Sequence, residues 1–113
     1  MKSIFITMLF SIFSVFGFSQ TQAEMNAEAS EKFKNADAVL SKTYKKVMAM
    51  QDAAGKKLLL EAQRAWIKYK EAHCKSACLD NIGGSIYALV YYSCLTEQTE
   101  ERIKHLNNYL TEE

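Results

Sequence analysis

No proline occurs anywhere in this chain, and only three glycines follow residue 19, at Gly55, Gly83 and Gly84. Proline and glycine are the residues that most often end helices and make turns, so breaks in regular structure must be few. Two stretches can hold them, QDAAGKK at 51–57 and LDNIGGS at 79–85. No segment alternates between apolar and polar residues for long enough to favour a strand. We therefore predict an all-α fold, a small antiparallel bundle of three to four helices.

The first 19 residues have the pattern of a secretory signal peptide. A short basic start precedes an almost wholly apolar run at 4–18, and the small residues Gly17 and Ser19 suit cleavage before Gln20. The run is too short and wrongly flanked for a stable membrane span, so a retained anchor is the lesser alternative. We predict a signal peptide at 1–19 and a single helical domain at 20–113. The domain is expected to be periplasmic or secreted, with no membrane attachment after cleavage.

The charge balance bears on the kind of partner. The chain has 14 Lys and Arg against 13 Asp and Glu, and loss of Lys2 with the signal peptide leaves 13 of each. A nucleic-acid-binding protein needs a basic surface that displaces counterions, so no nucleic-acid partner is predicted. The same balance provides no long-range attraction toward a charged protein.

Apolar residues recur at helical spacing in the first two segments. Residues 24–50 carry one apolar face, which is typical of an amphipathic helix. Residues 58–78 carry two apolar faces, and a helix of that kind must be covered on two sides. We therefore predict that this segment is the central helix, with Trp66 in the core. The first face comprises Leu58, Leu59, Ala62, Ala65, Trp66 and Tyr69, and the second comprises Leu60, Gln63, Ile67, Cys74 and Cys78.

The segment after the glycine pair carries two apolar stripes that are rotated away from each other. Thr96 lies between them as a possible N-cap, followed by acidic residues suited to a first turn. We predict two helices there, or one helix with a kink. Tyr87, Tyr91 and Tyr92 go nearly all round this helix, so at least one should be exposed as a contact residue.

Three cysteines, Cys74, Cys78 and Cys94, are expected to be oxidised in an exported chain, and the odd number leaves at least one unpaired within the chain. Cys74 and Cys78 lie one helical turn apart, a geometry poorly suited to a mutual bond. Either can reach Cys94 on the apolar face of the next helix. A zinc site with His73 is disfavoured because His73 points away from Cys74, and a redox role lacks the Cys-x-x-Cys motif.

Nothing in the sequence predicts an enzyme. No Ser-His-Asp set or pair of carboxylates with an obvious catalytic arrangement can be identified. Asp37 and Arg64 are interpreted as a structural ion pair or capping network. We therefore predict no catalytic residues, no metal and no cofactor.

Several motifs, in this order, resemble the LprI-type lysozyme-inhibitor domain family of small exported bacterial domains. The resemblance covers about residues 26–110. Its most specific parts are AQRAWIKYK followed by Cys74, the turn Gly83-Gly84-Ser85, and Cys94 with Thr99 and Arg102 downstream.

The family's cysteine pattern falls on Cys74 and Cys94, which implies that this pair forms the disulfide and leaves Cys78 over. A monomer is expected, with a dimer through Cys78 as the alternative. Lys70 departs from the pattern, because Arg is common at this position, so a planar guanidinium is absent there.

The resemblance implies that the protein binds a lysozyme and protects the producer's peptidoglycan. Such an inhibitor needs a rigid, protruding element, and the turn beside the disulfide is our candidate. The alternative is a non-enzymatic envelope structural or interaction module that docks to another exported protein through the tyrosine-rich helix. The candidate partner-binding residues are Asp80, Asn81, Gly83, Gly84 and Ser85 in the turn, and Tyr91 and Tyr92 on the helix.

Overall fold

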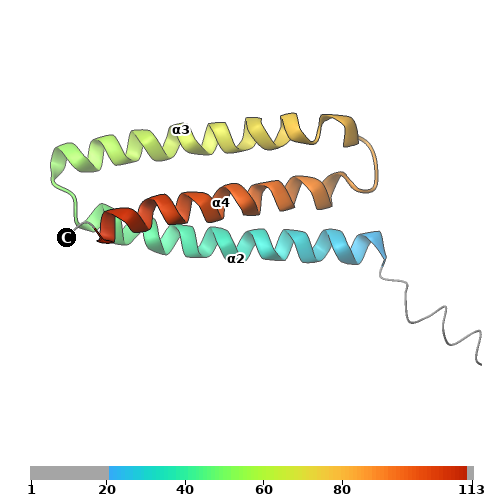
Figure 1. The fold of residues 1–113 in the computed structure, drawn as a ribbon, viewed down its shortest axis with the longest axis horizontal. Coiled ribbons are helices and arrows are strands. Elements are labelled where there is room, and N and C mark those ends of the chain that lie inside the picture. Colours follow the sequence, from blue (N-terminus) through green and yellow to red (C-terminus); the bar gives the residue numbers. More distant parts are fainter. Residues whose placement is uncertain (1–20, 112–113) are drawn as a thin grey trace, which may run out of the picture.

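The computed structural model describes residues 21–111, so the predicted signal peptide and its cleavage site lie outside the described range. Three long helices make up most of that range: α2 (Gln22–Ala49), α3 (Ala53–Ala77) and α4 (Tyr87–Thr111). In Figure 1, α3 runs antiparallel to α2 and α4, which run in the same direction. The all-α bundle prediction is confirmed for this range, with three helices and no strand. None of these helices is long and apolar enough to span a membrane.

Side-chain caps define the start of α2 and α3. The Thr21 hydroxyl accepts a hydrogen bond from the Glu24 amide at 3.1 Å, and the Asp52 carboxylate accepts one from the Gly55 amide at 2.8 Å. Each cap satisfies a backbone donor that has no partner inside its helix. Gly55 therefore lies in the first turn of α3, and the break before it is made by the Asp52 cap.

Helix α4 is one continuous helix from Tyr87 to Thr111, so the prediction of two helices is wrong. Thr96 does not cap a second helix, because its hydroxyl donates back to the Tyr92 carbonyl at 2.9 Å. The two stripes are rotated because they meet different neighbours. Cys94 bonds to α3, whereas Ile103 packs against the core that α2 and the start of α3 share with α4.

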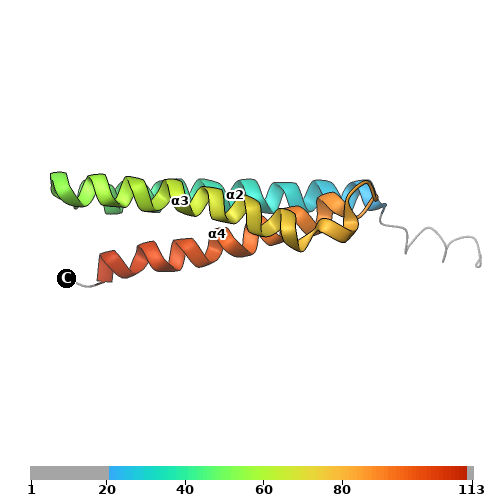
Figure 2. The same cartoon turned by 90° about the horizontal axis from the view of Figure 1, so that it is seen from above.

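Helix α3 is not the two-faced central helix that we predicted. Its buried residues form one stripe, Leu59, Gln63, Lys70 and Cys74. Leu58 on the first predicted face is 64% exposed, and Ile67 on the second is 40% exposed. Seen from above in Figure 2, α3 lies over α2 at its start and over α4 at its end. The helix thus crosses the α2–α4 pair and buries only the side that faces it.

The hydrophobic core lies at the end of the bundle where α2 meets α3. It is a cluster of four aliphatic side chains from all three helices, Leu40, Val47, Leu59 and Leu106. Trp66 packs against this cluster but is only partly buried. It therefore lies at the edge of the core and not, as we had predicted, inside it. Towards the other end, the buried residues include Ala29, Leu95 and the cysteines of α3.

Candidate functional site

The connection between α3 and α4 is a short turn held by its own backbone. A single 3₁₀ turn, η1 (Leu79–Asn81), follows Cys78, and the Asn81 amide donates to the Cys78 carbonyl at 2.9 Å. Gly83 then adopts φ = +81°, a left-handed conformation that favours glycine. The Gly84 amide donates back to the Asn81 carbonyl at 3.0 Å. These bonds give the predicted contact turn a defined shape.

Helix α2 also supports the turn. The Asn26 side-chain amide donates to the Ser85 carbonyl at 3.1 Å, across 59 positions of the sequence. This bond ties the end of the turn to the first part of α2. The turn is therefore attached to the bundle on both sides, at α3 through its own backbone and at α2 through Asn26.

The surface of the turn is more apolar than the sequence analysis anticipated. Leu79 and Ile82 are 66% and 65% exposed, and Ile86 just beyond is also exposed. Of the two candidate polar residues of the turn, Asp80 is exposed and Asn81 is partly buried. Leu79 and Ile82 are not among the predicted contact residues of the turn, which are all polar residues or glycines. The sequence feature that could have identified them is their position, because both are apolar residues in a break between helices, where no helical face can bury them.

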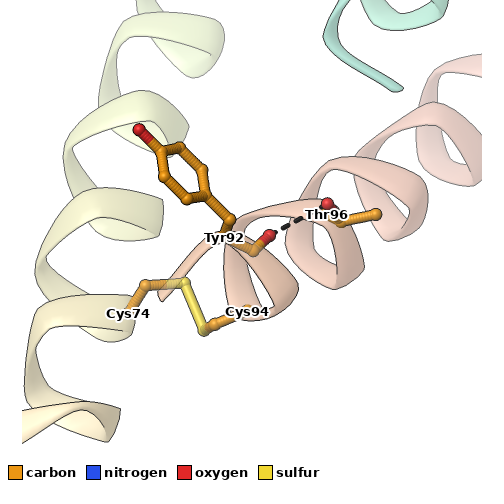
Figure 3. The surroundings of a disulfide bond; sticks show 4 residues. All are labelled: Cys74, Tyr92, Cys94 and Thr96. Atoms are coloured by element: carbon orange, nitrogen blue, oxygen red, sulfur yellow. Dashed lines mark hydrogen bonds between the residues drawn. A yellow bond between two sulfur atoms is a disulfide. The ribbon is translucent and has the colours of Figure 1, made fainter. Parts of the chain in front are cut away.

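A disulfide between Cys74 and Cys94 joins α3 to α4 close to this turn, with the two Cα atoms 5.6 Å apart (Figure 3). The pairing implied by the family resemblance is confirmed. Because the bond consumes both sulfurs, the zinc alternative is wrong. Among residues 21–111, no cluster of His, Cys, Asp or Glu could hold a metal ion.

Cys78 is the free cysteine and is completely buried. Burial raises the pKa of its thiol, because the charged thiolate is poorly solvated in the interior. A buried, protonated thiol is a poor nucleophile and is not presented to a second molecule. This placement disfavours the alternative of a dimer through Cys78.

The tyrosines at the start of α4 pack against each other and against α2. Tyr91 stacks on Tyr87 with ring centroids 5.6 Å apart, and Tyr92 packs against Phe33 of α2 at 6.0 Å. All three tyrosines are partly buried, so the expectation that one of them is exposed is wrong. Burial raises the pKa of Tyr91, with a smaller contribution from the neighbouring Tyr87. The bundle's exposed tyrosines are Tyr69 and Tyr109 on other faces.

Polar side chains lie in the interior where the motif residues of α3 and α4 face each other. Arg102 on α4 donates through Nε to the Oε1 atom of Gln63 on α3 at 2.9 Å, and Gln63 is 8% exposed. Burial lowers the pKa of Arg102. Two buried polar atoms here, the Thr99 hydroxyl and Nη2 of Arg102, have no hydrogen-bond partner within residues 21–111.

Lys70 is a buried cationic side chain, with 7% of its surface exposed. Its Nζ atom lies 4.9 Å from the centroid of the Trp66 ring and 5.3 Å from that of Phe33. These are cation–π contacts, which partly replace the hydration of the ammonium group. In the described part of the chain, no carboxylate forms an ion pair with Lys70 or Arg102.

Lys70 also lines a groove between α2 and α3, with a volume of about 430 Å³. Its walls come from residues 37–44 of α2 and residues 60–70 of α3. Its apolar lining comprises Leu40, Tyr44, Leu60, Trp66 and Ile67. Asp37 and Arg64 lie in its walls, and the ion pair predicted between them does not form in the described structure.

Comparison with known proteins assigns these features to a family. The sequence model of the family described as lysozyme inhibitor LprI matches residues 18–106 of this chain. The chain belongs to the LprI lysozyme inhibitor family. It is also 33% identical, over 103 aligned positions, to an uncharacterised protein of Rhizobium meliloti strain 1021, with 80% of this chain and 74% of that protein covered. No solved structure matches it.

The LprI match includes the turn, the disulfide and the buried polar residues. The structure brings together motif residues that are distant in sequence, since Gln63 precedes Cys74 and Arg102 follows Cys94. The contact turn lies at one end of the bundle, and the groove lies on its side between α2 and α3. The turn and the groove are therefore two separate surfaces of this bundle.

Proposed function

We propose that the protein is an exported inhibitor that binds a lysozyme and thereby protects the peptidoglycan of the producing cell. The single observation that carries the proposal is the match to the LprI lysozyme inhibitor family over residues 18–106. In this proposal residues 1–19 are a signal peptide, residues 20–113 form one non-enzymatic domain, and the domain acts as a monomer outside the cytoplasm.

We propose the turn at 79–85 as the surface that contacts lysozyme. Its backbone bonds and the nearby disulfide support this choice, because a preordered loop loses little conformational entropy on binding. Leu79 and Ile82 offer apolar area that a partner can bury, while Asp80 offers a charged acceptor. Gly83, Gly84 and Ser85 allow a close approach of the partner to the backbone. Tyr91 and Tyr92, the basis of the docking alternative, offer less surface because they are partly buried.

The test is a titration of the mature domain against several lysozyme classes, read as the loss of turbidity of a cell-wall suspension. We expect stoichiometric inhibition of at least one class. The double variant Leu79→Ala/Ile82→Ala should inhibit at least tenfold less strongly, because burying each side chain contributes about 1.5–3 kcal/mol. Asp80→Ala/Asn81→Ala should also weaken inhibition, with little change in melting temperature.

Leu58→Ala is the matched control, since Leu58 is 64% exposed but lies near the opposite end of α3. This variant should inhibit as strongly as the wild type. Equal inhibition by all variants would remove the turn from the contact surface. No inhibition of any lysozyme class by the wild-type domain would refute the proposed function and favour a docking module.

A further inference from the structure

The groove between α2 and α3 combines an apolar lining with an unusual charge. About 430 Å³ is within the range of small-molecule binding sites. Leu60 and Ile67 point apolar surface into it and remain 38% and 40% exposed.

The charge comes from Lys70, which lines the groove although it is more than nine-tenths buried. The Lys70 side chain is held against the protein by the faces of Trp66 and Phe33, which its Nζ atom contacts. No carboxylate among the described residues pairs with this ammonium group, so it can pair with an anion that enters the groove. The site therefore has an unmatched positive charge beside an apolar surface.

Gln63 supplies a second donor in the lining of the same groove, about two helical turns before Lys70 on α3. Its Oε1 atom accepts from Arg102, which fixes the orientation of the side-chain amide and leaves the NH₂ group without an acceptor in the described residues. Arg64 adds a further, exposed cation in the groove wall. Asp37 is the one acidic residue of the lining, and it is exposed and forms no ion pair with Lys70 or Arg64.

The geometry points to a binding site for a small monocarboxylate with an apolar body, an aliphatic chain or an aromatic ring. The carboxylate pairs with Lys70 and accepts from the Gln63 amide, while the apolar body lies along Leu60, Trp66 and Ile67. The groove is concave and accepts such a ligand from solvent. Asp37 repels a second negative charge, so a monocarboxylate is preferred over a dicarboxylate. This site is separate from the contact turn and does not depend on lysozyme binding.

The test is isothermal titration calorimetry of the mature domain with octanoate and 3-phenylpropionate. Their isosteric controls are octanamide and 3-phenylpropanamide, which have the same bodies without the charge. We expect saturable binding of a carboxylate at least tenfold tighter than that of its amide. Trp66 is the chain's one tryptophan, so its fluorescence should change on binding and report the location.

Two variants should change the affinity for a carboxylate in opposite directions. Lys70→Met removes the charge at similar length and should weaken carboxylate binding at least tenfold, with amide binding unchanged. Asp37→Asn removes the repelling charge and should strengthen carboxylate binding. Lys75→Met is the matched control, because Lys75 is an exposed lysine near the end of the same helix. If Lys70→Met does not fold, as judged by circular dichroism, the comparison of each acid with its amide and the effect of Asp37→Asn still test the proposed site.

Several outcomes would overturn the inference. They are equal affinities for acid and amide, unchanged affinity in folded Lys70→Met, weaker binding to Asp37→Asn, and no saturable binding of either acid. Binding of a short peptide with an internal glutamate, without binding of either small acid, would instead assign the groove to a protein partner and refute a small-molecule site.

Discussion

At the scale of single residues, the interior of this bundle contains polar groups where an aliphatic side chain would ordinarily lie. Thr99 is completely buried on α4, and its hydroxyl has no hydrogen-bond partner in the described range. Thr43 on α2 is also buried, but its hydroxyl donates to the Val39 carbonyl at 2.9 Å. The two threonines thus differ in whether the buried hydroxyl is satisfied, which gives a direct comparison of its energetic effect.

Thr99→Val should increase the free energy of unfolding by about 1 kcal/mol, because it replaces an unsatisfied buried hydroxyl by a methyl group of the same shape. Thr43→Val should decrease it by about 0.5–1 kcal/mol, because a satisfied hydrogen bond is lost. Urea denaturation followed by circular dichroism measures both. A loss of stability in Thr99→Val would show that the hydroxyl has a favourable role beside Arg102.

At the scale of the elements, α3 is the helix with the weakest attachment to the rest. Its buried stripe contains only one aliphatic residue, Leu59, and two polar ones, Gln63 and Lys70. The disulfide from Cys74 to Cys94 fixes its last turns to α4 (Figure 3). A covalent link is effective here because the helix buries little apolar surface of its own.

Cys94→Ser should therefore lower the free energy of unfolding by about 2–5 kcal/mol, and the chain-entropy model gives about 3 kcal/mol for a loop of this size. Wild-type protein in a reducing agent should lose a similar amount. Guanidinium denaturation under oxidising and reducing conditions measures both. Cys78→Ala keeps the disulfide and serves as the control, and it should cost less. A change below about 1 kcal/mol in Cys94→Ser would mean that packing alone positions the end of α3.

At the scale of the whole molecule, α2 and α4 form the packed pair and α3 crosses it (Figures 1 and 2). The core cluster draws Leu40 and Val47 from α2 and Leu106 from α4, with Leu59 as the single contribution of α3. This asymmetry leaves the groove on one side of the molecule and the contact turn at one end. The groove is thus a consequence of how α3 is placed, whereas the turn follows from the break between α3 and α4.

Leu106→Ala should destabilise the bundle by about 2–5 kcal/mol, because Leu106 is fully buried and its removal leaves a cavity. Ile67→Ala should change the free energy of unfolding by about 0.5 kcal/mol or less, since Ile67 is substantially exposed in the groove. Thermal and urea unfolding measure the pair. A large loss in Ile67→Ala would mean that α3 buries a second face in solution, as the two-faced sequence pattern had suggested.

Much of this architecture follows from the sequence. The absence of proline and the positions of two breaks specify an all-α chain of three to four long helices, and the periodicity of residues 24–50 identifies the face of α2 that contains the buried Leu40 and Val47. The pairing of Cys74 with Cys94 required the family resemblance as well, because helix geometry alone left Cys78 as an equal candidate. The position of the turn also followed from the glycine pair. These features depend on local backbone preferences and spacing, which a sequence states directly.

Only the tertiary structure decided which face of each helix is covered. Periodicity shows that Leu58, Leu60 and Ile67 are apolar, but it does not show whether a neighbouring helix lies against them. The crossing of α3 leaves those residues exposed while it buries Lys70 and Gln63. The continuity of α4 was decided in the same way, because its two stripes face different neighbours. Burial depends on contacts between residues distant in sequence, and a local pattern does not contain those contacts.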